Sequence, residues 1–288
     1  MDKQIKNKIE DQVNSTIMDV QSVSGGCISN AYKLRLNNGT SLFLKVNSSA
    51  NKDMFIREAH GLQELIQAAV IKIPDILDFD EDYILLEFIN SAGKQKNFSE
   101  DFGRKFALMH KFHNEYYGFY ENNYIGSNPQ INIPEQSENL NWAEFYFNKR
   151  LLYQFNLAEK KGNSTSALRS AIVKLEDKID TIITDSNEKP ALLHGDLWGG
   201  NYITDENGSA CLIDPAVYYG NREADLAMTK LFGGFDSKFY GAYNEMYPLS
   251  DGYDYRENIY KLYHILNHLN LFGSGYYSHC MSLISCYI

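Results

Sequence analysis

The chain has 288 residues, 44% hydrophobic and 14% aromatic, so it can form a substantial core in one large domain or two lobes and is not expected to be disordered. Its formal net charge of -10 argues against a nucleic-acid partner. No run approaches the ~20 apolar residues of a membrane span, and the first residues lack a signal-peptide pattern, so we expect a cytoplasmic protein with no membrane partner. The four cysteines share no C-x-x-C spacing, so we expect no zinc site.

The first stretch predicts a helix, a glycine loop and a β-hairpin. Apolar residues recur every four positions over residues 4–20 and predict an amphipathic helix. Gly25 and Gly26 follow, and then a turn at residues 37–40 joins two strand-like runs, the second of which carries Lys45. A glycine pair alone is weak evidence. Together with a lysine late in the returning strand, it is the arrangement with which kinases hold nucleotide phosphates.

Helical periodicity over residues 55–70 predicts the next element. Glu58 lies in its first turns, where a kinase helix carries the glutamate that pairs with the phosphate-binding lysine. We therefore predict an ion pair between Glu58 and Lys45. The alternative is a solvated acid on the helix surface.

Two further strands, over residues 73–79 and 83–89, complete the first part of the chain. The second is apolar on both faces and then turns polar, which marks a hinge between an N-lobe of residues 1–89 and a C-lobe of residues 90–288. Backbone groups at the hinge could contact an adenine edge, namely those of Glu87, Phe88 and Ile89.

The C-lobe begins with helical sequence. Ser99 is a candidate cap for the first helix. His110 and His113 have the spacing of a metal pair but lack a third ligand, so a structural or surface role is expected. The polar, aromatic stretch over residues 116–132 suits a sugar-like ligand. Two more helices are expected at about residues 141–159 and 164–184.

The stretch Leu192–Pro215 carries the strongest functional signal. Asp196 and Asn201 have the D-x-x-x-x-N spacing of a kinase catalytic loop. A hairpin with an Asn-Gly turn follows, and Asp214 stands where its second strand ends. This set provides a carboxylate to accept a hydroxyl proton, and an amide oxygen with a second carboxylate to hold Mg²⁺ against phosphate oxygens.

The residues after Asp214 indicate which class of molecule accepts the phosphoryl group. Only ten residues separate Asp214 from Asp225, which could brace the catalytic loop or be a simple helix-start acid. That leaves no room for a long activation segment, and His194 is not followed by the arginine of H-R-D. A small-molecule kinase is therefore predicted. The last periodic segment, residues 255–271, predicts a helix whose histidines are buried packing groups.

These motifs resemble the fructosamine kinase (ketosamine-3-kinase) family, on the aminoglycoside-phosphotransferase-like fold. The resemblance runs nearly end to end. It rests on the following pieces: Gly25–Ser29, Phe43–Asn47, Glu58–Leu62, Asn123–Gly126, Pro129–Asn132, His194–Trp198, Asp214–Ala216, Tyr219–Ala227 and Tyr263–His268. The pattern usually has a serine where this chain has Gly199.

The resemblance implies an α+β, bilobal protein-kinase-like fold, with a small antiparallel-sheet N-lobe and a larger, mostly helical C-lobe. It also implies ATP-dependent phosphorylation of the 3-hydroxyl of a ketosamine, a sugar adduct of a free or protein-bound amine, followed by decomposition and deglycation. Asp196 would be the base, Asn201 and Asp214 the Mg²⁺ ligands, and Lys45 with Glu58 the phosphate anchor. The substrate pocket would be shaped by Trp198, Asn123, Gln130, Asn132 and Tyr219.

Some alternatives remain open from the sequence. The acceptor could be another small alcohol, such as an aminoglycoside or choline, or the chain could be a pseudokinase that binds nucleotide without turnover. Cys27 lies in the expected phosphate loop. In related members a cysteine here can pair between subunits, so the protein is expected to be either a monomer or a redox-sensitive homodimer.

Overall fold

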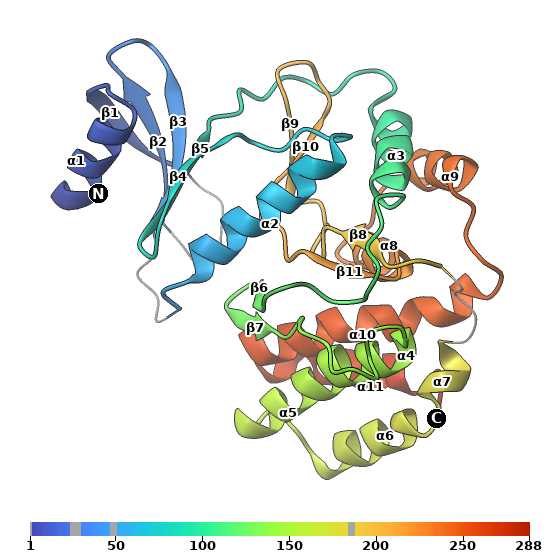
Figure 1. Ribbon diagram of the computed structural model, residues 1–288. Helices are drawn as coiled ribbons and strands as arrows, with labels where there is room; N and C mark the ends of the chain where they lie inside the picture. The colour runs from blue at the N-terminus through green and yellow to red at the C-terminus, as the bar shows by residue number, and fades with distance from the viewer. Residues whose placement is uncertain (1, 24–29, 47–50, 184–187) are drawn as a thin grey trace. The chain divides into compact units, whose positions relative to one another are not determined.

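The computed structural model describes the chain in four stretches, residues 2–23, 30–46, 51–183 and 188–288 (Figure 1). Its residue contacts define two compact units. Unit 1 comprises Met1–Phe98 and Tyr202–Asp214, and unit 2 comprises Ser99–Asn201 and Pro215–Ile288.

The sequence predicted a single boundary after Ile89. The division differs from it because the hairpin within Tyr202–Asp214, which belongs to the catalytic stretch, is part of unit 1. The backbone N–H of Ala92 donates to the carbonyl oxygen of Asp205 at 3.1 Å, and that of Gln95 to Gly208 at 3.1 Å. The segment that follows the predicted hinge is therefore tied to the hairpin turn.

Unit 1 is built on a five-stranded antiparallel sheet in the order β1-β2-β3-β5-β4 (Figure 1). Helix α2 packs against β4 and β5, and the hairpin β9–β10 completes the unit. The elements are α1 (Lys3–Gln12), β1 (Ile17–Val23), β2 (Asn30–Leu36), β3 (Ser41–Val46), α2 (Met54–Ala68), β4 (Ile76–Phe79), β5 (Tyr83–Glu87), β9 (Tyr202–Thr204) and β10 (Ala210–Leu212).

The first helix is shorter than predicted. It ends at Gln12, Asn14 has a positive φ of 47°, and Ile17 begins β1. The four-residue spacing was misleading because Ile17 does face the same core as Ile9, but from a strand after the chain has turned.

The predicted hairpin turns are confirmed. Gly39 has φ of +87° between β2 and β3, and Gly208 has φ of +77° between β9 and β10, conformations that glycine adopts without a Cβ penalty. Lys45 lies in β3, the middle strand of the sheet, opposite Ala31 of β2 on one side and Ile84 of β5 on the other. The lysine is thereby held on a rigid element.

Unit 2 is mostly helical, and α10 is its central helix, in contact with α5, α8 and α11 (Figure 1). Its elements are α3 (Phe98–Met109), β6 (Asn123–Ile125), β7 (Asn128–Gln130), α4 (Trp142–Tyr146), the π-helix η1 (Phe147–Leu152), α5 (Tyr153–Lys160), α6 (Ser166–Glu176), α7 (Ile179–Ile182), β8 (Ala191–Leu193), β11 (Tyr218–Gly220), α8 (Glu223–Thr229), α9 (Ser237–Met246), α10 (Tyr253–Phe272), the 3₁₀ turn η2 (Ser274–Tyr276) and α11 (Tyr277–Ile284). Within the four described stretches, no helix combines the length and the apolar character needed to cross a membrane.

The start of α3 differs from the expectation. The helix begins at Phe98, so Ser99 lies inside its first turn rather than at its cap. The Ser99 hydroxyl instead donates to the carboxylate of Asp236 at 2.5 Å. That carboxylate also caps α9 by accepting the backbone N–H of Phe239.

His264 in α10 is a buried neutral base. Burial lowers its pKa to about 3, and among the described residues its Nδ1 has no hydrogen-bond partner. It is therefore a packing group, as expected, but not a fully hydrogen-bonded one. The unfolded chain binds a proton at this residue below about pH 6.5, whereas the folded chain does not.

This difference predicts acid sensitivity. The contribution of His264 to stability is complete above pH 6.5 and is lost as the pH falls toward 3. At pH 5.5 the free energy of unfolding should be about 1.4 kcal/mol lower from this group alone. Urea unfolding of wild type and His264→Leu at pH 7.5 and 5.5 measures this loss of unfolding free energy. Equal pH sensitivity of both proteins would contradict this role.

Candidate active site

Lys45 is the centre of a buried charge cluster in unit 1. Its Nζ lies 2.7 Å from Oε1 of Glu58, on α2, and 2.5 Å from Oδ1 of Asp214, at the end of the β9–β10 hairpin. The predicted ion pair between Lys45 and Glu58 is therefore present. Three residues far apart in sequence meet here, which makes the cluster more than a surface ion pair.

The two carboxylates of this cluster stabilise the charged form of Lys45. Burial alone would lower the pKa of Lys45, but the carboxylates of Asp214 and Glu58 outweigh it and raise the pKa above its ordinary value. Burial raises the pKa of Glu58, against the opposing charge of the lysine. Lys45 is thus a fixed cation, suited to bind the phosphates of a nucleotide.

Asp214 has a strained backbone. Its φ is 55°, in the left-handed region, and it precedes a proline, which restricts the residue before it. Such strain is retained mainly at functional positions. The side chain is 36% exposed, so it can contact a ligand as well as Lys45.

The catalytic loop lies in unit 2, between β8 and Asn201. The side-chain amide of Asn201 donates to the carbonyl oxygen of Asp196 at 2.8 Å and to its Oδ2 at 3.0 Å. Asn201 thus fixes the orientation of the Asp196 carboxylate. Since Nδ2 makes both bonds, Oδ1 of Asn201 is left for another partner, and a neutral amide oxygen is a ligand that Mg²⁺ accepts.

Asp225 on α8 holds this loop through hydrogen bonds to its backbone. Its carboxylate accepts the backbone N–H of His194 at 2.7 Å and that of Gly195 at 2.8 Å, and it lies 3.3 Å from Nε2 of His110. Nδ1 of His110 in turn contacts the hydroxyl of Tyr243 at 2.7 Å. Burial lowers the pKa of His110, and its two ring nitrogens are used by the contacts with Asp225 and Tyr243, so this histidine has a structural role in supporting the loop.

Gly195 has no room for a side chain. Its φ is +82°, and an added Cβ would stand 2.0 Å from the carbonyl oxygen of Ala216. Gly199, four residues on, is open, with nothing within 4 Å of an added Cβ. A side chain is therefore excluded at Gly195 but can be accommodated at Gly199, in the same loop.

We expect Gly195→Ala to lower activity at least a hundredfold by displacing the loop, in line with the cost of about 1 Å of misplacement. Gly199→Ala should remain within about twofold of wild type, since it adds a methyl group in open space. Steady-state kinetics of both variants, with circular dichroism to check folding, measures this. Similar activities for the two variants would show that the loop is not held as described.

Three amide side chains predicted to contact the substrate are buried instead. Gln130 donates to Ala216 O at 2.9 Å and to Oδ1 of Asn123 at 2.9 Å, while Asn123 donates to Val217 O at 2.8 Å and Asn132 to Oδ1 of Asn123 at 2.7 Å. They are at most 5% exposed. Their hydrogen-bonding capacity is used to hold the backbone of residues 216–217, which fits a positioning role rather than direct contact with a sugar.

The remaining predicted substrate residues differ in exposure. Tyr219 is buried in β11, where its backbone exchanges hydrogen bonds with Gly118. Trp198 is 38% exposed and follows Asp196 by two residues, so its indole remains available to a ligand of the catalytic loop.

The hinge residues are only partly available. The N–H of Glu87 donates to Asp75 O at 2.8 Å and its carboxylate binds Lys72, so neither group is free to contact adenine. The ring of Phe88 lies 4.0 Å from Nζ of Lys33, and Ile89 is buried. The predicted Gly25, Gly26 and Cys27 lie outside the described residues.

Three buried arginines, Arg150, Arg222 and Arg256, were not foreseen. Arg150, in η1, donates to Oδ1 of Asn132 at 2.7 Å and lies 4.0 Å from the ring centroid of Tyr218. Arg222 makes a two-pronged ion pair with Glu188, at 2.8 and 2.6 Å. A lone arginine in a sequence pattern gives no signal of burial.

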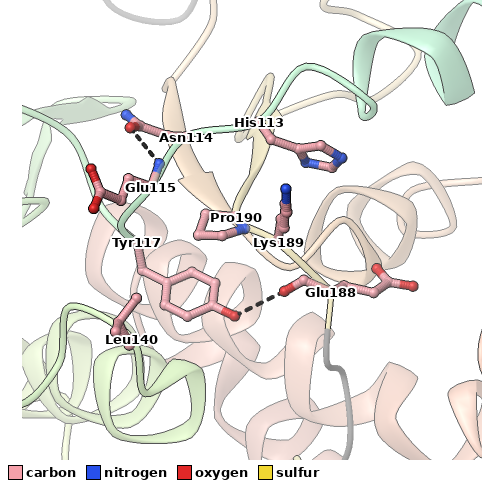
Figure 2. A pocket seen from close by; sticks show the side chains of 8 residues that line it. All are labelled: His113, Asn114, Glu115, Tyr117, Leu140, Glu188, Lys189 and Pro190. Carbon is pink, nitrogen blue, oxygen red and sulfur yellow. Dashed lines mark hydrogen bonds between the residues drawn. The ribbon is translucent and has the colours of Figure 1, made fainter.

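A cavity of about 620 Å³ lies elsewhere in unit 2 (Figure 2). It is lined by His113, Tyr117 and Glu188 among others, and the Tyr117 hydroxyl donates to Glu188 O at 3.2 Å. None of the predicted site residues lines it. The candidate residues thus form two groups, the catalytic loop in unit 2 and the Lys45 cluster in unit 1.

The antiparallel sheet with its Lys-Glu pair, and the helical unit with its D-x-x-x-x-N loop, define a phosphotransferase of the protein-kinase-like class. The sequence profile of the family described as "Fructosamine kinase" matches residues 1–288. The chain belongs to the fructosamine kinase family.

Individual relatives agree with this assignment. The chloroplastic protein-ribulosamine 3-kinase of Arabidopsis thaliana is 39% identical over 279 residues, covering 94% of this chain and 83% of that one. A crystal structure described as a fructosamine-3-kinase from Thermobifida fusca superposes with a TM-score of 0.88 at 30% identity, covering 98% and 97% of the two chains. An ADP-bound aminoglycoside phosphotransferase, with a TM-score of 0.66, 14% identity and 99% and 98% coverage, shares the fold.

Proposed function

We propose that this protein is an ATP-dependent kinase that phosphorylates the 3-hydroxyl of ketosamines. The observation that carries the proposal is the full-length family match in a chain that retains Lys45, Glu58, Asp196, Asn201 and Asp214. Because a ketosamine 3-phosphate is unstable, the product would decompose and release the amine, so that the net result is deglycation.

In the proposed mechanism the oxygen of the 3-hydroxyl attacks the γ-phosphorus of ATP while Asp196 accepts the hydroxyl proton. The bond between the γ-phosphorus and the β,γ-bridging oxygen breaks, and ADP is the leaving group. The hydrogen bond from Asn201 Nδ2 to Asp196 Oδ2 keeps the carboxylate oriented for this transfer. Lys45, held by Glu58, binds nucleotide phosphates. Positioning and charge neutralisation carry most of such a reaction, because the transferred phosphoryl group needs no covalent intermediate with the protein.

The donor set is compatible with Mg²⁺. The amide oxygen of Asn201 and the carboxylate of Asp214 are hard oxygen ligands, the type that Mg²⁺ prefers, and both side chains can accept a further partner. When bound, the ion would neutralise charge on the phosphate oxygens.

A phosphorylation assay tests the function. Purified protein is supplied with Mg²⁺-ATP and, separately, ribulosyl-lysine, fructosyl-lysine, a glycated protein, an aminoglycoside and choline. ADP release is followed by a coupled assay and the product by ³¹P NMR. We expect turnover with the ketosamines. Turnover restricted to the aminoglycoside or choline would favour a different alcohol kinase, and nucleotide binding without any ADP release would favour a pseudokinase.

A further inference from the structure

A row of aromatic side chains starts at the catalytic loop and continues across unit 2. Trp198 packs edge-on against Phe232 with ring centroids 6.2 Å apart, and Phe232 lies 4.7 Å from the ring of His268. His268 in turn contacts Phe272 at 5.4 Å and Tyr276 at 5.1 Å. We call these five side chains the aromatic row.

The apolar members of the row are unusually open to solvent. Trp198 is 38% exposed, Phe232 46% and Phe272 57%. Singly exposed apolar residues are common, but a continuous exposed group marks a surface that contacts a ligand or partner. Since the row begins two residues after Asp196, the ligand that it serves is the substrate of that loop.

The rings are held in place before any ligand arrives. The indole of Trp198 lies against Gly200, where an added Cβ would come within 2.5 Å of it. Phe232 has φ of 53°, a left-handed conformation that is rare for a bulky residue, and Gly233 and Gly234 follow it. Nδ1 of His268 contacts His264 O at 2.7 Å. A preformed surface loses little side-chain freedom on binding.

A ketosamine carried by a lysine in a polypeptide keeps the reacting hydroxyl apart from the polypeptide. Eight bonds separate the carbon of the 3-hydroxyl from the lysine Cα, about 10 Å when extended, given bonds near 1.5 Å. With the 3-hydroxyl at Asp196, the polypeptide therefore lies outside the immediate surroundings of the base. The aromatic row is an exposed surface that is continuous with the catalytic loop through the contact between Trp198 and Phe232.

The chemistry also matches. The nitrogen of a ketosamine is a secondary amine, protonated at neutral pH, and it lies three bonds from the carbon of the 3-hydroxyl. An ammonium group near the faces of Trp198 and Phe232 gains cation–π attraction. A sugar without an amine lacks this attraction.

Resting on the function proposed above, we propose that the row beyond Trp198, made of Phe232, His268, Phe272 and Tyr276, is the binding subsite for the polypeptide around a ketosamine-bearing lysine. The row then favours protein-bound over small adducts. It also makes the exposed phenylalanines determinants of substrate specificity.

Phe272→Ala tests this proposal, because Phe272 is the most exposed ring of the row and ends α10. Tyr255→Ala is the matched control. It removes a ring that is 54% exposed at the other end of the same helix. Each protein is assayed with the ketosamine of methylamine and with a seven-residue peptide bearing the same sugar on a central lysine.

We expect Phe272→Ala to raise KM for the glycated peptide about five- to tenfold, with kcat and the methylamine adduct unaffected, as for the loss of one aromatic contact. Tyr255→Ala should match wild type on both substrates. Equal KM values of wild type and Phe272→Ala for the peptide, or a parallel loss on both substrates, would overturn the subsite.

Failure of the proposed function would look different. Wild type would then phosphorylate neither ketosamine. Fluorescence polarisation of the labelled glycated peptide still tests the row in that case. Weaker binding to Phe272→Ala than to Tyr255→Ala supports the subsite, and equal binding removes it.

Discussion

Replacing Asp196 with asparagine is expected to lower kcat for ketosamine phosphorylation by about a thousandfold, within the range for loss of a general base. The amide keeps the shape of the side chain but cannot accept the hydroxyl proton. ATP affinity should stay within about twofold, because the phosphate anchor of Lys45, Glu58 and Asp214 is formed within unit 1 without Asp196. Steady-state kinetics and titration calorimetry with a non-hydrolysable ATP analogue measure the two quantities.

Asp205→Asn serves as a control for the loss of a carboxylate in the same stretch of chain. Asp205 accepts the backbone N–H groups of Asn207 and Ser209 in the β9–β10 turn and takes no part in the proposed chemistry. It should retain most of the activity. Near-normal turnover by Asp196→Asn would mean that another group is the base.

The sequence predicted well those parts of the molecule whose structure is determined by residues close together in the chain. Gly39 and Gly208 allowed the turns to be placed because their positive φ values are cheap only for glycine. The Lys45–Glu58 pair followed from the order of a lysine strand and a glutamate helix. For Asp225 the sequence left two roles open, a brace of the catalytic loop and a simple helix-start acid, and the structure shows the first through its bonds to His194 and Gly195.

Features that depend on non-local packing were missed. The three-residue strands β8 and β11 pair across 24 intervening residues, and no short apolar run indicates such a partner. The polar stretch with Asn123, Gln130 and Asn132 was interpreted as a sugar-binding surface because amides suit sugars. Amides suit buried backbone equally well, and only the fold shows that Ala216 and Val217 are their partners.

The buried position of Asp225 separates it from an ordinary helix-start acid. Its two oxygens accept the N–H groups of His194 and Gly195. Burial alone would raise the pKa of its carboxyl, but the hydrogen bond from His110 and, after it, the backbone N–H of Gly195 hold that pKa below the usual value. Asparagine at this position replaces one acceptor oxygen by an NH₂ group that faces a backbone donor. A buried donor without an acceptor is costly, and the loop that carries Asp196 loses one of its attachments.

We therefore expect Asp225→Asn to lower the free energy of unfolding by about 3 kcal/mol, as for the loss of one partner of a buried charged network. Activity should fall by about a hundredfold, because the loop that carries the base is displaced. Urea unfolding and kcat/KM measure the two effects. Asp254→Asn is the matched control, since Asp254 also lies in the first turn of a helix but is exposed. If both variants behave like wild type, Asp225 acts only through the dipole of α8, and the loop must be held by the backbone contact between Ala216 and His194 instead.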